Sequence, residues 1–441
     1  MPGSGVATST GAGAATGRPP ATRSLPDPRW VELLVCATAL AGAWLAGRLA
    51  LPVALLAGVV AVHALVLHRW PTRRAVRLVW FAVLLLLLGV LPAVGYVKAT
   101  DRGVATLGHD GGVHVSDEAV RVLLSGRDPY QASYAAALAE WRIDVEGRPA
   151  PNPLAGRYPY WPGSLALLAA VEGPLRAVGA DPDPRVLYLL VWCLLGLWLA
   201  SWSLRARGDL LLPLAVCLNP LLLPYMWQGV NDVLVVAGMA VAAVALAGRR
   251  VVLAGLALGV AVSVKLLIAP MVLLFLVWLA AEARRGRLER GRAWRAAAAT
   301  VVPGALVALP FLAWHPRDFL GDAVAYHLAL VPDAYPIAGH GLPALLLRAG
   351  VLGDPFGPSP LWATALPAAV VVMAGVWWVW TRPGWRTLLW VSGLVLGGVL
   401  FFHRSFMFYY VDVPATALAL AALVGGQASR TRFSSFTRSR Q

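Results

Sequence analysis

The sequence predicts an all-α fold, a polytopic transmembrane helical bundle, and three observations lead to this class. The chain of 441 residues is 59% hydrophobic and 13% charged, and its mean hydropathy is +0.68. Soluble domains carry roughly 25% charged residues, so a soluble enzyme and a disordered protein are both excluded. A spanning helix takes about 20 apolar residues, which leaves room for about 12–13 hydrophobic segments with some loops.

The charges follow the topology of such a protein. The formal net charge is +15, from 37 basic and 22 acidic residues. The basic residues stand in short clusters between apolar runs, as in cytoplasmic loops, and no basic stripe alternates with exposed aromatic residues. We therefore expect membrane lipids as surroundings and no nucleic-acid partner. The cysteines (Cys36, Cys193 and Cys217) lie in apolar runs and predict neither a disulfide nor a metal site.

The chain divides into a membrane domain and two tails. Residues 1–29 predict a disordered basic cytoplasmic tail, residues 30–425 the transmembrane domain, and residues 426–441 a basic cytoplasmic tail. The apolar runs lie near 30–48, 50–67, 78–97, 162–178, 186–204, 210–226, 232–248, 251–264, 266–281, 298–314, 361–380, 386–402 and 408–425.

Two long polar loops interrupt these runs, at 98–158 and 315–360. The basic clusters at 68–74 and 284–292 mark the cytoplasm, so we expect both loops on the external face of the cell membrane. Two cytoplasmic termini require an even number of passes, whereas the runs above are odd in number. We expect 210–226, which three prolines interrupt, to be re-entrant; the alternative is 162–178.

The first loop contains the favoured catalytic carboxylate. Asp110 follows His109 in a turn with Gly111 and Gly112, just past a span, where a carboxylate can take a proton from a hydroxyl acceptor. A helix is predicted to start with Ser116 as its N-cap and to end at Gly126. Asp117 and Glu118 suit the first turn of that helix, and any of these acids can instead be a solvated loop charge.

Isolated ionisable groups near the spans form a second set of candidates. Asn231 and Asp232 precede an apolar run, where either can also serve as a helix N-cap. Lys265 stands alone among apolar residues and suits a lipid phosphate, unless it extends toward the interface. Arg404 can hold a phosphate oxygen with its planar guanidinium group.

Three histidines raise the question of a metal. His327, His340 and His403 lie in the polar loops without helical ligand spacing, so we expect no divalent metal. The chain has no Gly-rich nucleotide fingerprint and no nucleophile elbow, so we do not expect a soluble nucleotide donor.

Several ordered pieces of the chain resemble the GT-C superfamily of integral-membrane glycosyltransferases, which use polyprenyl-phosphate-linked sugars. The chain is most similar to actinobacterial mannosyltransferases of the phosphatidylinositol-mannoside (PimE-like) type. The pieces are His109–Gly111, Gly126–Tyr130, Tyr158–Tyr160, Asn219–Pro220, Gln228–Asp232, Gly255–Lys265 and Tyr335–Gly339.

The resemblance implies a GT-C-like fold, an external first loop with Asp110 as the catalytic base, and inversion at the sugar's anomeric carbon. It implies no cofactor beyond the lipid-linked hexose donor, and a lipid or glycan acceptor. Lys265 and Arg404 would stabilise the leaving phosphate, and Asp232 would order the acceptor or a cationic partner. The stretch after Asp110 lacks the aromatic residues usual in such relatives, which leaves Asp117 as an alternative base.

The resemblance completes the set of expected site residues. The candidates for substrate binding are His109, Asp117, Glu118, Tyr130, Tyr158, Asn231, Asp232, Lys265, His327, His340, His403 and Arg404. Mannose is the first expectation for the sugar, with arabinofuranose and glucose as alternatives. A transporter or flippase is the alternative function, but the chain shows no internal repeat. A structural or assembly factor would not need an isolated intramembrane lysine.

Overall fold

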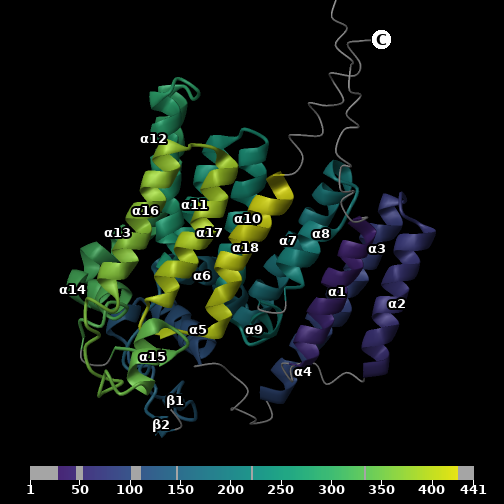
Figure 1. Cartoon of the computed structure of the whole chain (residues 1–441). Coiled ribbons are helices and arrows are strands. Elements are labelled where there is room, and N and C mark those ends of the chain that lie inside the picture. Colours follow the sequence, from purple (N-terminus) through teal and green to yellow (C-terminus); the bar gives the residue numbers. More distant parts are fainter. Residues whose placement is uncertain are drawn as a thin grey trace, which may run out of the picture.

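The computed structural model describes residues 28–45, 53–100, 111–145, 148–219, 222–331 and 334–425. Helices dominate these residues and stand side by side in one bundle (Figure 1). The expected all-α, polytopic transmembrane class is therefore confirmed. The predicted tails lie outside the described residues, except for Pro28 and Arg29.

The helices along the bundle are apolar around most of their circumference, as expected of segments surrounded by lipid or by other helices. They are α1 (Pro28–Leu45), α2 (Val53–Arg69), α3 (Arg74–Leu85), which continues through the π-helical turn η1 (Leu86–Val90) into α4 (Leu91–Thr100), α7 (Pro184–Ala206), α8 (Leu211–Cys217), α9 (Leu223–Trp227), α10 (Asp232–Ala247), α11 (Val251–Val264), α12 (Ala269–Arg284) after the 3-10 turn η4 (Leu266–Ile268), α13 (Arg290–Trp314), α16 (Ala365–Thr381), α17 (Trp385–Phe401) and α18 (Asp412–Gly425).

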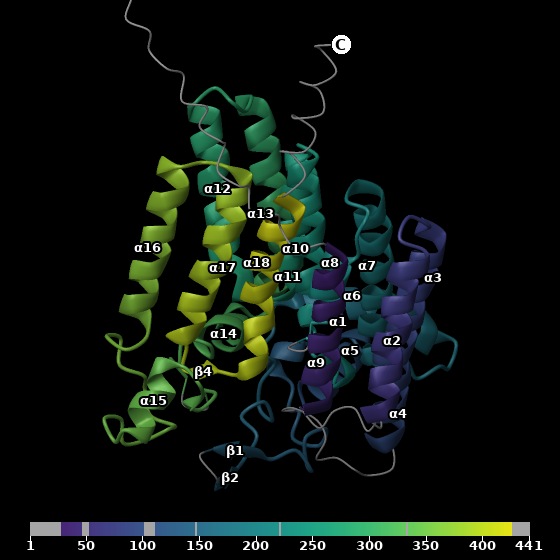
Figure 2. The same ribbon diagram turned by 45° about the vertical axis from the view of Figure 1, so that its right-hand side comes forward.

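The remaining elements gather at one end of the bundle, with α15, β1 and β2 farthest out (Figure 2). They are α5 (Gly112–Leu124), α6 (Pro162–Ala177), α14 (Pro316–Leu320), α15 (Leu342–Arg348), the short turns η3 (Pro129–Gln131), η5 (Gly321–Ala325) and η6 (Phe408–Val411), and the strands β1 (Ile143–Val145), β2 (Arg148–Ala150), β3 (Ala338–Gly339) and β4 (Ser405–Phe406). Strands β1 and β2 pair antiparallel, whereas β3 and β4 pair in parallel.

Length and composition support a membrane setting. Four helical stretches of the described residues are long and apolar enough to cross a membrane unaided: Arg74–Tyr96, Pro184–Ala206, Leu266–Arg284 and Arg290–Trp314. Shorter apolar helices pack beside them. Small residues let two of the helices approach closely, since a Cβ at Gly255 or Gly259 of α11 would lie about 2.5 Å from a backbone oxygen of α13.

The short basic connections meet at the other end of the bundle. Arg292, in the first turn of α13, donates to the carbonyl oxygen of Arg249, between α10 and α11, at 2.5 Å. Arg285 donates to the carbonyl oxygen of Thr381 at the end of α16 at 3.3 Å. Arg77 of α3 pairs with Glu32 of α1 at 2.6 Å inside the protein. This end therefore carries the clusters that predicted the cytoplasmic face, and we refer to it as the basic end.

The run at 210–226 crosses the bundle, so its expected re-entrant path is wrong. Its start lies at the basic end, where the Leu210 amide donates to Glu32 at 2.8 Å. Its far end, after α9, reaches Gln228, which lines a cavity at the opposite end. Helix α8 therefore starts at the basic end and α9 ends at the cavity, with Pro224 in the first turn of α9.

The alternative segment, 162–178, fits a path that does not cross. Tyr160, before α6, and Arg185, after it, both line the same cavity. Glu172 and Arg176 near the end of α6 pair with each other at 2.9 Å, and Arg176 also pairs with Asp117 of α5. These charges keep the helix on the cavity side, since an ionised group is costly inside lipid. Excluding α6 leaves an even number of passes.

Candidate active site

A cavity opens at the end of the bundle opposite the basic end. It encloses about 920 Å³, part of which is open to solvent. Its lining comes from the end of α4, the start of α5, the first and second long loops, the start of α7, the turn before α10 and the segment before α18. This position, where helix ends and long loops meet, suits a small-molecule substrate.

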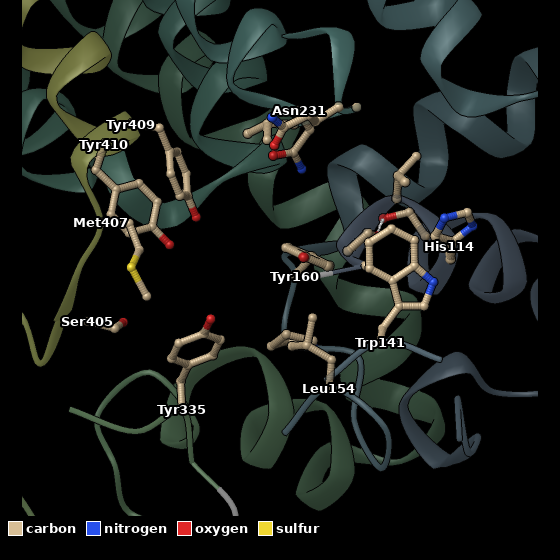
Figure 3. Close-up of a pocket in the computed structure, with 18 of the residues that line it drawn as sticks. His114, Trp141, Leu154, Tyr160, Asn231, Tyr335, Ser405, Met407, Tyr409 and Tyr410 are labelled. Carbon is tan, nitrogen blue, oxygen red and sulfur yellow. Dashed lines mark hydrogen bonds between the residues drawn. The ribbon is translucent and has the colours of Figure 1, made fainter. Parts of the chain in front are cut away.

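Aromatic side chains form two facing walls of this cavity. Figure 3 shows Tyr335, Tyr409 and Tyr410 on one side and His114 with Trp141 on the other. The rings of His114 and Trp141 lie 4.9 Å apart. Tyrosine and tryptophan offer an apolar face together with a polar edge, which suits a sugar with hydroxyl groups around an apolar ring.

The first loop enters the cavity at Gly111. Asp110 and His109 lie outside the described residues, and Gly111, which follows them, lines the cavity. Gly111 has φ +78°, and a Cβ there would lie 2.4 Å from Leu138. The turn therefore requires glycine.

Helix α5 starts one turn earlier than predicted. Gly111 is the N-cap, and the Ser116 hydroxyl donates to the Gly112 carbonyl oxygen at 2.9 Å within the helix. The Ser116 N-cap is therefore wrong, because the Gly-Gly turn supplies an earlier start.

The segment before α10 brings polar groups to the cavity. Gln228 and Asn231 line it, whereas Asp232 points behind the wall and pairs with Lys265 at 2.7 Å. Lys265 lies beneath two lining residues, with Nζ 5.1 Å from the Tyr410 ring centre and 6.0 Å from that of Tyr409. The Asp232–Lys265 pair thus supports the wall from behind.

Two of the predicted histidines line the cavity. His327 Nε2 lies 2.6 Å from the Pro159 carbonyl oxygen, and His403 Nδ1 accepts from the Ser405 amide at 3.2 Å. Burial lowers the pKa of His403 to about 4, with further lowering by His327 and Arg404. The ring is therefore neutral at pH 7 and suits hydrogen bonding.

Other predicted site residues lie outside the described lining of the cavity. These are Asp117, Glu118, Tyr130, Tyr158, His340 and Arg404. Asp117 pairs with Arg121 at 3.3 Å, Glu118 is partly exposed on α5, and His340 is exposed. Arg404 donates to the carbonyl oxygens of Pro355 and Gly357 at 3.3 and 3.2 Å, which anchors the second loop.

Tyr130 and Tyr158 belong to the buried support of the cavity. Their ring centres are 5.5 Å apart, and the Tyr130 hydroxyl donates to the carbonyl oxygen of lining residue Tyr160 at 2.9 Å. Asp322 accepts from the Tyr158 amide and from Arg157, each at 3.0 Å. These contacts join the first long loop to the second.

Sequence comparison decides the kind of protein. The model of glycosyltransferase family 87 matches residues 173–408. The chain belongs to glycosyltransferase family 87. No curated protein and no solved structure matches the chain significantly. Family 87 membership establishes a membrane glycosyltransferase and replaces the transporter and assembly-factor alternatives.

The family 87 match covers much of the cavity. It contains Arg185, the turn from Gln228 to Asn231, His327 and His403, while the first loop with Asp110 precedes it. Among the residues that the structure describes, no three His, Cys, Asp or Glu side chains form a group able to hold a metal ion.

Most of the lining residues were not among the predicted site residues, and Arg185 and Trp141 are two of these. Arg185 stands in Asp181-Pro182-Asp183-Pro184-Arg185 before an apolar run, and it reads as one more charge at a span end. One feature of the sequence could have identified Arg185. It stands at the external start of a predicted span, where the positive-inside pattern does not call for a basic residue. Trp141 carried no signal, because its approach to the cavity depends on the fold of the first loop.

Proposed function

We propose that this membrane glycosyltransferase transfers a hexose, with mannose first, from a polyprenyl-phosphate donor to a lipid or glycan acceptor. The reaction takes place at the external face of the cytoplasmic membrane. The observation that carries this proposal is the position of the cavity, at the end of the bundle opposite the basic connections. By the positive-inside rule the basic end faces the cytoplasm, and nucleotide sugars are made there. A lipid-linked donor suits an external cavity at the membrane surface.

The proposed reaction inverts the configuration at the anomeric carbon of the sugar. Asp110 takes the proton of the acceptor hydroxyl as its oxygen bonds to the anomeric carbon. The bond between that carbon and the phosphate oxygen breaks, and polyprenyl phosphate leaves. In support, the residue after Asp110 lines the cavity. Asp117, the alternative base, is held in an ion-pair cluster with Arg121 and Arg176.

The aromatic walls support a sugar as the transferred group. Tyr335 and Tyr410 face His114 and Trp141 across the cavity (Figure 3). Asn231 and the neutral His327 supply hydrogen bonds for hydroxyl groups. We propose that no divalent metal takes part, and activity in excess EDTA should equal activity without it. Mannose follows from the resemblance, with glucose and arabinofuranose as alternatives.

A donor comparison tests this proposal. Purified protein in lipid nanodiscs receives radiolabelled mannose on polyprenyl phosphate or on GDP, with a bacterial lipid extract as acceptor source. Label should pass into the acceptor fraction from the lipid-linked donor alone. Polyprenyl phosphates carrying glucose or arabinofuranose then identify the sugar. Transfer from GDP-mannose with none from any lipid-linked sugar would contradict the proposal.

A further inference from the structure

One buried amide in the cavity has no partner inside the protein. Gln228 is 5% exposed and lines the cavity, yet its Nε2 makes no hydrogen bond with the described residues. An unpaired buried donor is costly, and such groups in native proteins usually have a partner. The amide therefore indicates a ligand atom that accepts a hydrogen bond.

The cavity that Gln228 lines also contains a cation. The Arg185 side chain is 9% exposed, and Asp183 orients it by accepting from its backbone amide at 2.8 Å and from its Nε at 2.9 Å. The planar guanidinium group of arginine matches the oxygens of a phosphate.

Gly229 brings the amide and the cation to one turn. It has φ +85°, and a Cβ there would lie 2.8 Å from Cγ of Arg185 and 2.9 Å from Cγ2 of Val113. Any side chain at this position would displace Arg185 from the turn that carries Gln228. The glycine thus lets the turn that carries Gln228 pack against the Arg185 side chain, and both side chains line the same cavity.

Position, and not the absence of a partner, separates Arg185 from the other basic candidates, since Arg185 is itself paired with Asp183. Lys265 is paired with Asp232, and Arg404 donates to two loop carbonyl oxygens. Neither belongs to the described lining, whereas Arg185 does. A sugar hydroxyl is neutral and does not require a cation, while a phosphate group is anionic and accepts hydrogen bonds.

We propose that Gln228 and Arg185 bind the phosphate group of the lipid donor and stabilise the charge that develops on it as it leaves. This inference rests on the proposed function, because it takes the donor to be a polyprenyl phosphate. The two side chains act on the leaving oxygen and its neighbours through hydrogen bonds that strengthen as negative charge grows.

Lipid binding tests the inference without catalysis. The probes are decaprenyl monophosphate and decaprenol, which differ in the phosphate alone, and binding to the protein in nanodiscs is measured by competition with a fluorescent polyprenyl phosphate. The variants are Gln228→Glu, which keeps the shape but adds a negative charge, and Arg185→Gln. Arg317→Gln removes an exposed charge on α14 and serves as the matched control.

The expected result is a loss of about tenfold or more in affinity for the phosphate lipid in both variants, with decaprenol binding and Arg317→Gln unchanged. Unchanged decaprenol binding also shows that the variants fold. Equal affinity of all variants for the phosphate lipid would overturn the inference while leaving the proposed donor class intact. Failure of the wild-type protein to prefer the phosphate lipid would overturn the donor class itself.

Discussion

The ammonium group of Lys265 lies 2.7 Å from Oδ1 of Asp232, and this contact joins the end of α11 to the start of α10. The Asp232 side chain is 1% exposed and that of Lys265 is 15% exposed. A charge pair held this far from water depends on both partners, because either charge alone would be buried without compensation. The pair lies behind Tyr409 and Tyr410, so its loss should also shift these two rings in the cavity wall.

Removing one partner of this pair should destabilise the protein. Lys265→Met and Asp232→Asn should each lower the free energy of unfolding by about 3–5 kcal/mol, as for other buried pairs. The double variant, which removes both members of the pair, should lose less stability than the sum of the two single variants. Thermal unfolding in nanodiscs measures this. A double variant as unstable as the sum of the two single variants would show that the groups do not interact.

Lowering the pH should decrease the free energy of unfolding, because His403 is harder to protonate in the folded protein than in the unfolded chain. Its pKa is lowered to about 4 from a normal value of 6.5, so the unfolded chain binds more protons than the folded one between these values. Stability therefore falls as pH drops from about 6.5 toward 4, by about 1–2 kcal/mol at pH 5. Protonation of Nδ1 also removes the acceptor for the Ser405 amide.

The matched variant is His403→Gln, which cannot titrate. The difference in melting temperature between pH 7 and pH 5 should be smaller in this variant than in the wild-type protein. An unchanged difference would assign the acid sensitivity to other groups.

The contact of Asp322 with the first loop should hold the cavity together. Asp322 is 3% exposed and accepts hydrogen bonds from Arg157 and from the Tyr158 amide. Asp322→Ala removes the shared acceptor of these two donors and should cost about 2–4 kcal/mol of stability. Glu140→Gln, an exposed change in the same loop, should have no effect. Equal melting temperatures for the two variants would contradict a joining role.

Cysteine accessibility should fix the orientation of the bundle. His340 is exposed beside the cavity end, while the Arg287 side chain, at the basic end, is 52% exposed. In intact cells, a membrane-impermeant maleimide should label His340→Cys and should label Arg287→Cys only after permeabilisation. The reverse pattern would place the cavity in the cytoplasm.

Much of the architecture follows from the sequence, because lipid imposes strong rules on composition. The apolar runs and basic clusters predicted the helices and the end at which the basic connections meet. The path of 162–178 did not follow, since it depends on contacts across the fold such as that of Arg176 with Asp117 of α5. Pairwise contacts across the fold, such as Lys265 with Asp232, are absent from local patterns.

Part of the candidate site was also predictable, because lipid restricts where polar residues can lie. Asn231, His327 and His403 line the cavity as polar groups that lipid would exclude. Arg185 was not predicted because a basic residue at the end of a span usually reflects membrane topology. Tyr130 and Tyr158 were predicted to bind substrate but are buried outside the described lining of the cavity.

Sugar transfer by an Asp110→Asn variant tests the central claim most directly. Initial rates from polyprenyl-phosphate mannose are compared for the wild-type protein, Asp110→Asn, Asp117→Asn and the exposed-site control Glu140→Gln, all at equal folded concentration. Loss of the general base should lower the rate of Asp110→Asn by ~10²–10⁴-fold, while Asp117→Asn and Glu140→Gln stay within a few-fold of the wild-type protein. Full activity of Asp110→Asn, or an equal loss in Asp117→Asn, would contradict the assignment of Asp110 as the base.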